Sequence, residues 1–554
     1  MTEPKKRKPL GVLLKEKGII NDDHVKFALM DQKISKVRFG VILERLGFVS
    51  QYDVATTLAE QENIPYIDID EVLFGKEELR LFNKNICLKN LFLPLAIEGN
   101  KIRIIIADLF NHDAIIQLIT RHTGLQPIIH LGEENKMINA INANYYFLEN
   151  PIEAQLAKEI SLLELDTEHA RGYDRFIKLI LQYAVKMRAT DVHIRPMEKS
   201  LSVAFRVDGV MQTVLIAPDS MKRVISSLKM KSEIDIAEQR LPQDGRFSEI
   251  ILNNEHEFRV STIVTEYGEN VVIRLLAVSS SVMGLSQLGF YEEDVQLVKD
   301  IFNEPFGIVL LTGPTGSGKS TTLFAGIRCL DLMEKNVITV ENPIEYRIPL
   351  LRQTQVNIKA GYTFANAIRY FLRHDPDVIM VGEIRDRETA ETAVSASSTG
   401  HLVLSTLHTN SAIGSISRLK DLGVNSFLIA DSLLGIVSQR LVRKICPNCR
   451  ESYTPDSEDK KYLGITDIET LYRGTGCEAC SNTGYLGRTL IYEILQVDKS
   501  MAVMIDKNAP LDTITDYANT HDFHDIFSIC RRKVVEGVTT VAECKRVIGK
   551  MRTS

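Results

Sequence analysis

A phosphate-binding loop motif constrains the fold of this chain more than any other feature. Residues 313–320 have the sequence GPTGSGKS, follow the apolar run GIVLLT and precede a helical pattern. Glycines at this spacing let backbone N–H groups approach a phosphate, and the N-terminus of the following helix points at the same place. The strand–loop–helix context therefore predicts an α/β domain with a nucleotide-binding loop.

The loop gives its residues candidate roles. Lys319 is expected to neutralise charge on the β- and γ-phosphates, and the Ser320 hydroxyl to ligate Mg²⁺. We therefore expect ATP and Mg²⁺ as ligands. The candidate nucleotide-binding residues are Gly313, Pro314, Thr315, Gly316, Ser317, Gly318, Lys319, Ser320 and Thr321.

Two apolar runs further along the chain end in acidic residues. Residues 377–381 lead into Gly382 and Glu383, the arrangement of a Walker B acid placed on the metal or on the attacking water. Residues 337–341 lead into an acidic turn that contains Glu345. Both runs are therefore predicted to be buried strands that deliver carboxylates to the phosphate site.

Two histidines, His401 and His408, flank a third apolar run at residues 402–406. A single histidine is more often a satisfied core residue than a reactive one. Two histidines around a strand beside a phosphate site favour a role in sensing phosphate.

Length and charge limit the class of protein. A chain of 554 residues is too long for one hydrophobic core, so we expect three or four domains. Its net charge of −6 gives no overall attraction to nucleic acid or anionic lipid. No apolar run approaches the ~20 residues of a membrane-spanning helix. We expect a cytoplasmic protein that meets a membrane only through partners.

Four of the eight cysteines form two CxxC pairs, Cys446 with Cys449 and Cys477 with Cys480. Two such pairs supply the four thiolates of a tetrahedral Zn²⁺ site, and the other cysteines are expected to be buried thiols. Redox-active pairs are one alternative. A nucleic-acid-binding zinc ribbon is another, because basic residues surround the first pair: Arg440, Arg443, Lys444 and Arg450.

The N-terminal region contains an internal repeat. Residues 9–32 align with residues 38–61, and each copy has the pattern of a short helix, a glycine stop and a second helix. In the first copy Gly18 is the helix stop and Asn21 the candidate N-cap of the second helix. In the second copy these positions are Gly47 and Ser50. A helical docking module made by duplication is one hypothesis for this repeat.

The middle of the chain alternates apolar and polar residues as strands do. Asp208-Gly209 predicts a hairpin, residues 239–246 predict another turn, and Arg259 and Arg274 lie on predicted strands. From the residues alone, an arginine on a strand is usually solvated or salt-bridged.

Composition shifts give the expected boundaries. The predicted parts are an α/β N-terminal domain at 1–150, a linker or connecting helix at 151–170, a middle domain at 171–281 that closes with a serine-rich patch at 279–281, and a domain at 282–554 that contains the zinc module at 441–490 and C-terminal helices at 491–554.

Four separated motifs carry a family resemblance over about residues 171–554. Together they resemble the hexameric ATPases of type II secretion and type IV pilus assembly, including mannose-sensitive pilus ATPases. The motifs are GPTGSGKSTT at 313–322, VENPIEY at 340–346, FLRHDPDVIMVGEIRD at 371–386 and TGHLVLSTLHTN at 399–410.

The resemblance implies a fold and further site residues. The fold is a RecA-like P-loop ATPase core preceded by a PAS-like α+β domain and a helical and α/β N-terminal domain, with a tetracysteine zinc module. Glu345 becomes the catalytic carboxylate that activates water, and Glu383 the Walker B acid. Arg259 and Arg274 match arginines that approach the γ-phosphate. Arg369 and Arg373 match further arginines that lie near the nucleotide site or a subunit interface in that family.

The implied function is a homo-hexameric Mg²⁺-ATPase that drives a pilus or pseudopilus. It would act at the inner membrane through a platform protein and an adaptor, without nucleic acid. The tetracysteine module is typical of assembly ATPases rather than retraction ATPases. The repeat resembles a cyclic-di-GMP-binding domain whose second copy keeps Arg38, whereas the first has Pro9, which cannot donate a hydrogen bond.

Two alternatives remain from the sequence. Asn342 replaces an aspartate that the family usually carries, which leaves open a nucleotide-binding regulator that does not hydrolyse ATP. A nucleic-acid translocase on a RecA-like core is the other, but the net charge and the absence of tryptophan give little support for a basic, aromatic-lined channel.

Overall fold

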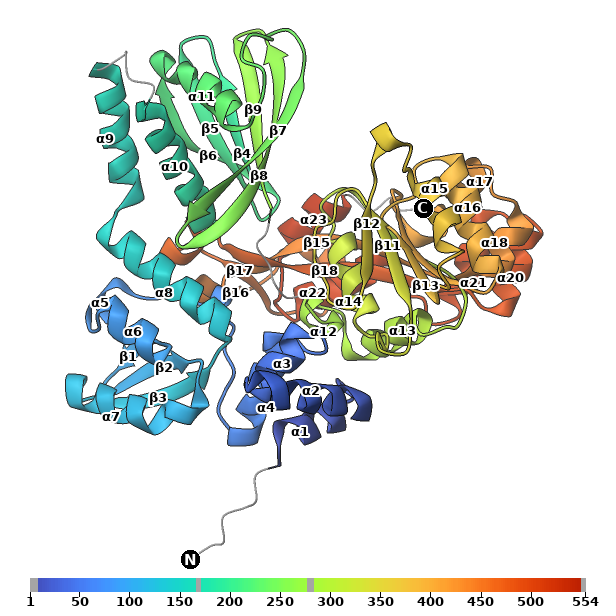
Figure 1. The fold of residues 1–554 in the computed structure, drawn as a ribbon, viewed down its shortest axis with the longest axis horizontal. Helices are drawn as coiled ribbons and strands as arrows, with labels where there is room; N and C mark the ends of the chain where they lie inside the picture. The colour runs from blue at the N-terminus through green and yellow to red at the C-terminus, as the bar shows by residue number, and fades with distance from the viewer. Residues whose placement is uncertain (1–7, 166–170, 277–282, 550–554) are drawn as a thin grey trace, which may run out of the picture. The chain divides into compact units, whose positions relative to one another are not determined.

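The computed structural model describes residues 8–165, 171–276 and 283–549, and the chain divides into two compact units (Figure 1). The P-loop unit consists of residues 8–53 and 283–549, and the middle unit of residues 54–165 and 171–276. The serine-rich boundary predicted at 279–281 lies outside the described residues.

The P-loop unit is built on a seven-stranded sheet. Its neighbouring strands are parallel except for the last pair, which is antiparallel. The order is β12 (Arg352–Gln355), β11 (Val337–Glu341), β13 (Val378–Val381), β14 (Leu402–Leu407), β10 (Gly307–Thr312), β15 (Leu433–Ile445) and β18 (Tyr485–Gln496). All four strands expected around the nucleotide motif are therefore confirmed.

Helices cover both faces of this sheet, so every residue of β10 is buried. Val309 and Leu311 share one core with α13 (Glu292–Phe302) and α14 (Lys319–Ile327). On the other side, Ile308 and Leu310 share a second core with several helices. These include α15 (Phe364–Phe371), α16 (Arg387–Ser398), α17 (Ala412–Asp421) and α18 (Ser426–Ser432), together with two helices of the C-terminal region. Burial on both faces explains the uninterrupted apolar run in the sequence.

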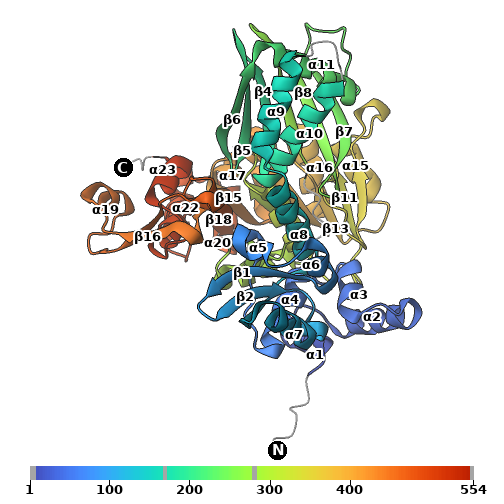
Figure 2. The ribbon, with the colours of Figure 1, turned by 90° about the vertical axis from the view of Figure 1, so that its left-hand side faces the viewer.

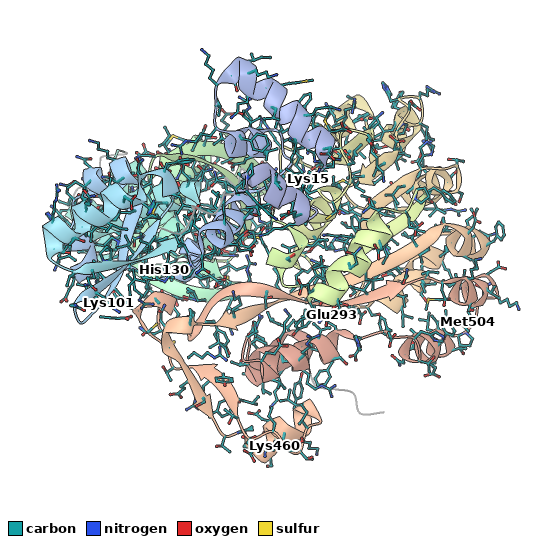
Figure 3. All side chains as sticks on the ribbon, turned by 90° about the horizontal axis from the view of Figure 1, so that it is seen from below. Lys15, Lys101, His130, Glu293, Lys460 and Met504 are labelled. Atoms are coloured by element: carbon teal, nitrogen blue, oxygen red, sulfur yellow. The ribbon has the colours of Figure 1, made fainter. Side chains whose placement is uncertain are left out.

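The C-terminal region is helical and amphipathic, as predicted. Its helices are α20 (Lys499–Asp506), α21 (Leu511–Asn519), α22 (Ile526–Val535) and α23 (Val541–Ile548). Arg532 of α22 forms a 2.5 Å ion pair with Glu293 of α13, and Glu293 is labelled in Figure 3. The cysteine module adds α19 (Ser457–Leu463) and the hairpin β16 (Arg450–Tyr453) and β17 (Leu471–Gly474).

The N-terminal repeat forms two similar helix pairs. These are α1 (Leu10–Glu16) with α2 (Asp22–Ser35), and α3 (Phe39–Arg45) with α4 (Gln51–Glu62). Gly18 and Gly47 have φ values of 66° and 79°, which L side chains rarely adopt. The side chain of Asn21 accepts a hydrogen bond from the His24 N–H, and Ser50 Oγ accepts one from Asp53 N. The predicted helix stops and caps are therefore confirmed.

The repeat contacts the end of the P-loop helix within the P-loop unit. Arg328, which follows α14, donates to Asp53 Oδ2 at 3.0 Å. One turn further, Asp331 Oδ2 accepts a hydrogen bond from Asn21 Nδ2 at 2.5 Å. Both copies of the repeat thus reach the segment that follows α14.

The middle unit begins with a small three-stranded sheet. Its strands are β1 (Phe92–Glu98), β2 (Lys101–Ile106) and β3 (Gln126–Leu131), packed with α5 (Lys76–Arg80), α6 (Lys84–Asn90), α7 (His112–Thr123) and α8 (Glu134–Glu149). Lys101 on β2 and His130 on β3 mark this sheet in Figure 3.

The second part of the middle unit is a six-stranded antiparallel sheet. Its order is β6 (Val210–Pro218), β5 (Ser200–Val207), β4 (Ala189–Pro196), β9 (Gly268–Leu275), β8 (Asn254–Thr265) and β7 (Gln243–Ile251). It shares one core with α9 (Ile152–Leu165), α10 (Arg171–Lys186) and α11 (Val224–Lys231), and α9 runs beside α10 in Figure 2. The hairpin at Asp208-Gly209 is confirmed by positive φ at both residues.

Two expectations for this region differ from the structure. The turn predicted at 239–246 is shorter, because β7 begins at Gln243. The segment expected to be a linker or connecting helix does form a helix, α9, but its Ile152, Leu156 and Leu163 are buried against α10 and the sheet. The sequence reading missed these core contacts because acidic residues separate the three apolar ones. On a helix, however, the three apolar residues lie on one face.

A search of the described helices for a bilayer-crossing segment gave no candidate of sufficient length and apolarity.

Replacing Gly326 with alanine tests the packing of the P-loop helix. By helix propensity alone, Gly326→Ala within α14 should add about 1 kcal/mol of stability. A β-carbon there would lie 2.2 Å from the buried ring of Phe302, so we expect a loss of about 1–3 kcal/mol instead. Thermal unfolding measures the change, and adding Phe302→Leu should restore part of it. A higher unfolding midpoint for Gly326→Ala alone would contradict this packing.

Candidate nucleotide and metal sites

The phosphate-binding loop is shaped by close backbone approach to β15. Gly313, Gly316 and Gly318 have φ values of 142°, 77° and 87°. A β-carbon at Gly313 would lie 2.3 Å from the backbone oxygen of Gln439 on β15, so the position admits only glycine. The Gln439 side chain also donates to the Ser317 backbone oxygen at 2.8 Å. The loop is thus held against β15 at both its start and its middle, in the setting of a glycine-rich loop that binds phosphate.

The side chains of the loop fit a phosphate ligand. Lys319 is 9% exposed and folds back so that Nζ donates to the Gly313 and Pro314 oxygens at 2.8 and 3.2 Å. Burial lowers the pKa of Lys319, and the nearby Glu383 carboxylate opposes that shift. Ser317 Oγ is buried and has no hydrogen-bond partner among the described residues. A cradle of N–H groups with an orphaned hydroxyl and a buried cation fits a nucleotide phosphate chain.

The candidate Mg²⁺ ligand, Ser320, is the second residue of α14 and is half-buried beside the loop. The neighbouring Thr321 hydroxyl lies 3.4 Å from the Tyr346 hydroxyl. A hydroxyl oxygen at the start of the P-loop helix suits a magnesium ion that bridges phosphates.

Glu383 and His408 meet at the same edge of the sheet as the loop. Glu383 follows β13 and His408 follows β14, and both strands run parallel to β10. The carboxyl ends of parallel strands share one edge, which is why these residues converge. His408 Nε2 lies 3.7 Å from Glu383 Oε2, and Arg385 Nε donates to the same oxygen at 2.6 Å. Glu383 is 14% exposed, so its negative charge is partly shielded from water.

Two other glutamates occupy the acidic turn after β11. Glu341 is buried and accepts hydrogen bonds from Thr339 Oγ1 at 2.7 Å and Gln353 Nε2 at 2.9 Å. Burial raises the pKa of Glu341, and these hydrogen bonds oppose the shift. Glu345 is exposed, and its backbone N–H also bonds the Glu341 carboxylate. Sequence reasoning selected Glu345 and passed over Glu341, although an acid at the end of an apolar strand was the available signal.

His401 lies at the other end of its strand. It precedes β14, and the His401 oxygen accepts a hydrogen bond from Gly307 N at the amino end of β10. The P-loop follows the carboxyl end of β10, so the whole β10–β14 ladder separates His401 from it. Within the P-loop unit His401 and His408 do not meet at one site, and a phosphate role for His401 stays a prediction.

The arginines predicted in the middle unit are cross-strand neighbours. Arg259 on β8 pairs with Arg274 on β9, and the row continues across adjacent strands in both directions. Its full order is Arg206, Asp191, Arg274, Arg259 and Arg246 on β5, β4, β9, β8 and β7. Directly paired residues share a sheet face, so four guanidinium groups and one carboxylate lie on one face.

Only part of that positive charge is balanced. Asp191 accepts from Arg274 Nε at 3.0 Å and lies 3.8 Å from Arg206 Nε. Arg246 and Arg259 have no side-chain hydrogen bond or ion pair among the described residues. Like charges paired across strands are unfavourable without an anion, so this row is a candidate anion-binding surface. Arg206 and Arg246 were missed from the sequence because only the strand register reveals the row.

Other predicted arginines have local roles. Arg369 on α15 pairs with Glu388 at 2.8 Å and also donates to Asn366. Arg373 is exposed after α15. Arg38 directly precedes α3, in the position that Pro9 has before α1.

The four cysteines of the CxxC pairs converge on one point. The Sγ atoms of Cys446 and Cys477 lie 3.8 Å apart, those of Cys449 and Cys480 3.9 Å apart, and those of Cys477 and Cys480 3.7 Å apart. A tetrahedral ion with metal–sulfur bonds of about 2.3 Å requires sulfur separations of about 3.8 Å. The Gly484 N–H also points at Cys480 Sγ, at 3.2 Å, as thiolate ligands favour. The residues therefore fit a tetrahedral metal ion.

The basic residues around this cluster are used within the chain. Arg443 pairs with the buried Glu543 at 2.8 Å and its guanidinium carbon lies 3.9 Å from the centre of the Tyr485 ring. Arg450 stacks on Tyr472 at 4.0 Å. The charge of Arg443 is therefore balanced by Glu543, which weakens the case for a nucleic-acid zinc ribbon at this residue.

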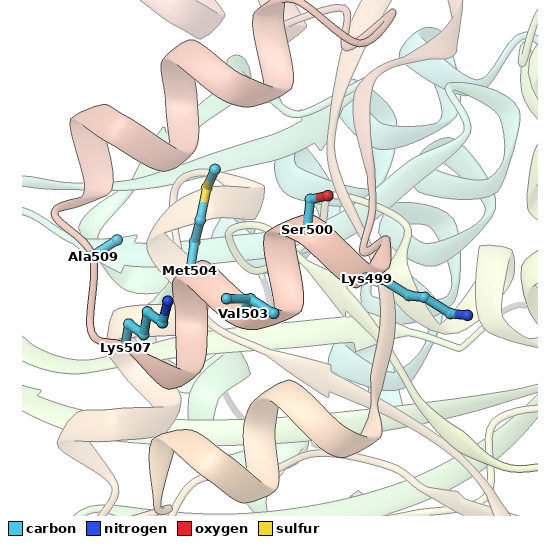
Figure 4. A pocket seen from close by; sticks show the side chains of 6 residues that line it. All are labelled: Lys499, Ser500, Val503, Met504, Lys507 and Ala509. Carbon is cyan, nitrogen blue, oxygen red and sulfur yellow. The ribbon is translucent and has the colours of Figure 1, made fainter.

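A shallow hollow lies on α20, away from these groups (Figure 4). No residue of the P-loop, of its acidic partners or of the cysteine cluster lines it. The lining residues are Lys499, Ser500, Val503, Met504, Lys507 and Ala509.

A phosphate loop, a Walker B carboxylate and a histidine at one edge of a parallel sheet define a P-loop ATPase. Comparison with protein families matches residues 166–546 to the type II/IV secretion system protein family and residues 62–150 to the MshEN domain. The chain belongs to the type II/IV secretion system protein family.

Individual relatives agree with this assignment. The type II secretion system protein E of Pseudomonas aeruginosa is 48% identical over 399 residues, which cover 71% of this chain and 79% of the relative. The type IV pilus assembly ATPase PilB of Myxococcus xanthus is 34% identical over 556 residues, which cover 96% of this chain and 98% of the relative. The solved structure of the Legionella pneumophila ATPase DotB aligns with a TM-score of 0.50 and 20% identity over 67% of this chain and 95% of that one, and so shares the fold.

The surroundings of His193 on β4 predict a pH-dependent stability of the middle unit. Burial lowers the pKa of His193 on β4, and the positive charge of Arg195 lowers it further. The unfolded chain then binds more protons than the folded one below the usual histidine pKa of about 6.5, so stability is lost as the pH falls through the folded pKa.

Arg195→Gln should raise the pKa of His193 and reduce that loss, whereas Arg121→Gln on α7 should not. Imidazole chemical shifts followed by NMR, with unfolding midpoints near neutral and mildly acidic pH, measure both effects. An unchanged His193 titration in Arg195→Gln would refute the electrostatic cause.

Proposed function

We propose that this protein is a hexameric Mg²⁺-dependent ATPase that powers assembly of a type IV pilus or a type II secretion pseudopilus. The observation that carries the proposal is the convergence of Lys319, Glu383 and His408 at one sheet edge in a chain of this family. The relatives named above are a type II secretion protein and a pilus assembly ATPase, and the alignment with the latter spans nearly the whole chain.

The catalytic roles follow from the chemistry of each side chain. Lys319 and the loop N–H groups bind the phosphates, and Ser320 ligates Mg²⁺. Glu345 orients and deprotonates the attacking water. Glu383 is the Walker B acid, whose carboxylate is placed on the metal or on the attacking water. His408 senses the γ-phosphate through its approach to Glu383. Arg259 and Arg274 supply positive charge that stabilises the transferred phosphoryl group.

The work is done on partners. Hydrolysis changes the relation between the middle and P-loop units, and this movement is passed to an inner-membrane platform protein and an adaptor. The protein is placed at the cytoplasmic side of the inner membrane through these partners. Assembly is favoured over retraction because the chain carries the tetracysteine module.

A second ligand is proposed for the N-terminal region. The structure contains two similar helix pairs with Arg38 ahead of the second, and an MshEN domain follows them. These features support binding of cyclic-di-GMP through Arg38, with partner docking as the competing hypothesis.

The rival functions have less support. A non-hydrolysing regulator rests on Asn342 alone, and both carboxylates proposed to act on water and metal, Glu345 and Glu383, are present. A nucleic-acid translocase requires a basic, aromatic-lined channel, and the net charge of −6 and the absence of tryptophan give it little support.

Removing the Walker B charge should abolish turnover and spare binding. We expect Glu383→Gln to lower kcat by at least ~100-fold while ATP still binds, because the amide cannot replace the carboxylate at the metal or water. Phosphate release over a range of protein concentrations measures the effect, and wild-type activity per subunit should rise as subunits assemble. Glu391→Gln, an exposed acid of α16, is the matched control.

The regulator hypothesis predicts the opposite pattern. Wild-type protein that binds ATP tightly but releases no phosphate at any concentration would exclude the motor.

The cysteine cluster is proposed to bind one Zn²⁺ per chain. Cys449→Ser should lose the metal and lower the unfolding temperature, because zinc binding free energy contributes to folding. Cys329→Ser, a half-buried cysteine outside the cluster, should keep both. Elemental analysis of purified protein gives the zinc content, and a metal-free wild type that unfolds at the same temperature with added zinc would exclude the site.

A further inference from the structure

A buried polar row runs across the P-loop sheet just beneath the nucleotide site. Thr312 on β10 pairs with Leu407 on β14 and with Ser438 on β15, and Ser438 pairs with Glu493 on β18. Thr312, Ser438 and Glu493 are at most 6% exposed. Polar groups in the middle of a sheet core are costly unless each has a hydrogen-bond partner, so their partners show what the row holds in place.

Glu493 joins the starts of two helices. Its Oε1 accepts a hydrogen bond from Ala412 N at 2.5 Å, and its Oε2 accepts one from Ile526 N at 3.3 Å. Ala412 begins α17 and Ile526 begins α22. Burial raises the pKa of Glu493, and the two N–H groups oppose that shift. Helix N-termini rather than a bonded cation therefore stabilise this carboxylate among the described residues.

The segment between His408 and Ala412 is fastened from both sides. Thr409 N donates to Thr312 Oγ1 at 3.1 Å, which ties the segment to the strand that leads into the P-loop. Arg440 Nη2 lies 3.4 Å from the Asn410 oxygen, and its Nη1 donates to the oxygen of Val547, in the last turn of α23, at 2.6 Å. Glu493 fixes the far end of the segment at Ala412.

Strand β15 connects this hydrogen-bond network to the phosphate loop. Ser438, Gln439 and Arg440 are consecutive on β15: the first pairs with Glu493, the second bonds the P-loop at Ser317, and the third reaches Asn410. The position of His408 relative to Glu383 thus depends on a segment that the Glu493 row and β15 hold.

We infer that Glu493 is a positioning residue for ATP hydrolysis. It holds the His408–Ala412 segment against the P-loop strand and links it to α22, so that a shift of His408 is passed to the C-terminal helices through one carboxylate. The inference rests on the sensor role proposed for His408. It adds Glu493 as a residue that acts on hydrolysis through the His408–Ala412 segment and not through contact with Lys319.

The first test compares two buried glutamates. Glu493→Gln places an amide donor against one of two backbone donors, so we expect kcat to fall about tenfold or more while KM and ATP affinity change little. Glu543→Gln is the matched control, because Glu543 of α23 is equally buried but bonds Arg443 and Arg546 instead of the His408 segment. If both variants keep similar kcat values at equal stability, the inference is wrong.

The second test is a double-mutant cycle. If Glu493 acts through His408, Glu493→Gln should have little further effect on kcat in a His408→Ala background. A purely structural role would give independent, multiplicative losses, which would overturn the inference. Should Glu493→Gln fail to fold, Glu493→Asp, which keeps the charge but withdraws it by one methylene, takes its place in the cycle.

The two proposals fail in different ways. A wild type without phosphate release removes the proposed function itself. An active wild type with a multiplicative cycle leaves the ATPase in place and removes only the role of Glu493.

Discussion

The close approach of β15 to the phosphate loop is the constraint on which the rest of the P-loop unit depends. Gln439 presents its backbone to Gly313 and its amide to Ser317, so one strand residue fixes both the start and the middle of the loop. Any side chain at Gly313 would push the strand away. On the same strand Ser438 pairs with Glu493 and Arg440 reaches Asn410, so the loop and the His408–Ala412 segment share one support.

Charge is distributed very differently in the two units. In the P-loop unit Glu341 and Glu493 are buried and are held by hydrogen bonds, whereas Glu345 is exposed. In the middle unit Arg246 and Arg259 are cross-strand neighbours beside Arg274, and Asp191, the acid within the row, bonds Arg274. A buried carboxylate needs hydrogen-bond donors that are already in place. An arginine on a sheet face is stabilised by water until an anion binds.

Local patterns predicted most elements near the site. The apolar strands, the glycine loop, the helix stops at Gly18 and Gly47 and the Asp208-Gly209 hairpin each follow from steric rules that act within a few residues. Distant packing decided what local patterns did not show: the connecting helix α9 is part of a core, and within the P-loop unit His401 lies a full strand length from the loop. The arginine row and the Glu493 row were invisible because strand register is set by pairing across the sheet.

The sequence by itself determined that this chain binds phosphate on a glycine loop, carries an acid after a neighbouring strand and gathers four cysteines in two pairs. These are local facts, since loop geometry and ligand spacing act over a few residues. Only the tertiary structure decided which acids and cations meet, because parallel strands bring Glu383 and His408 together and register places Thr312, Ser438 and Glu493 in one row. Contacts across strands depend on the whole sheet, and no short stretch of sequence encodes them.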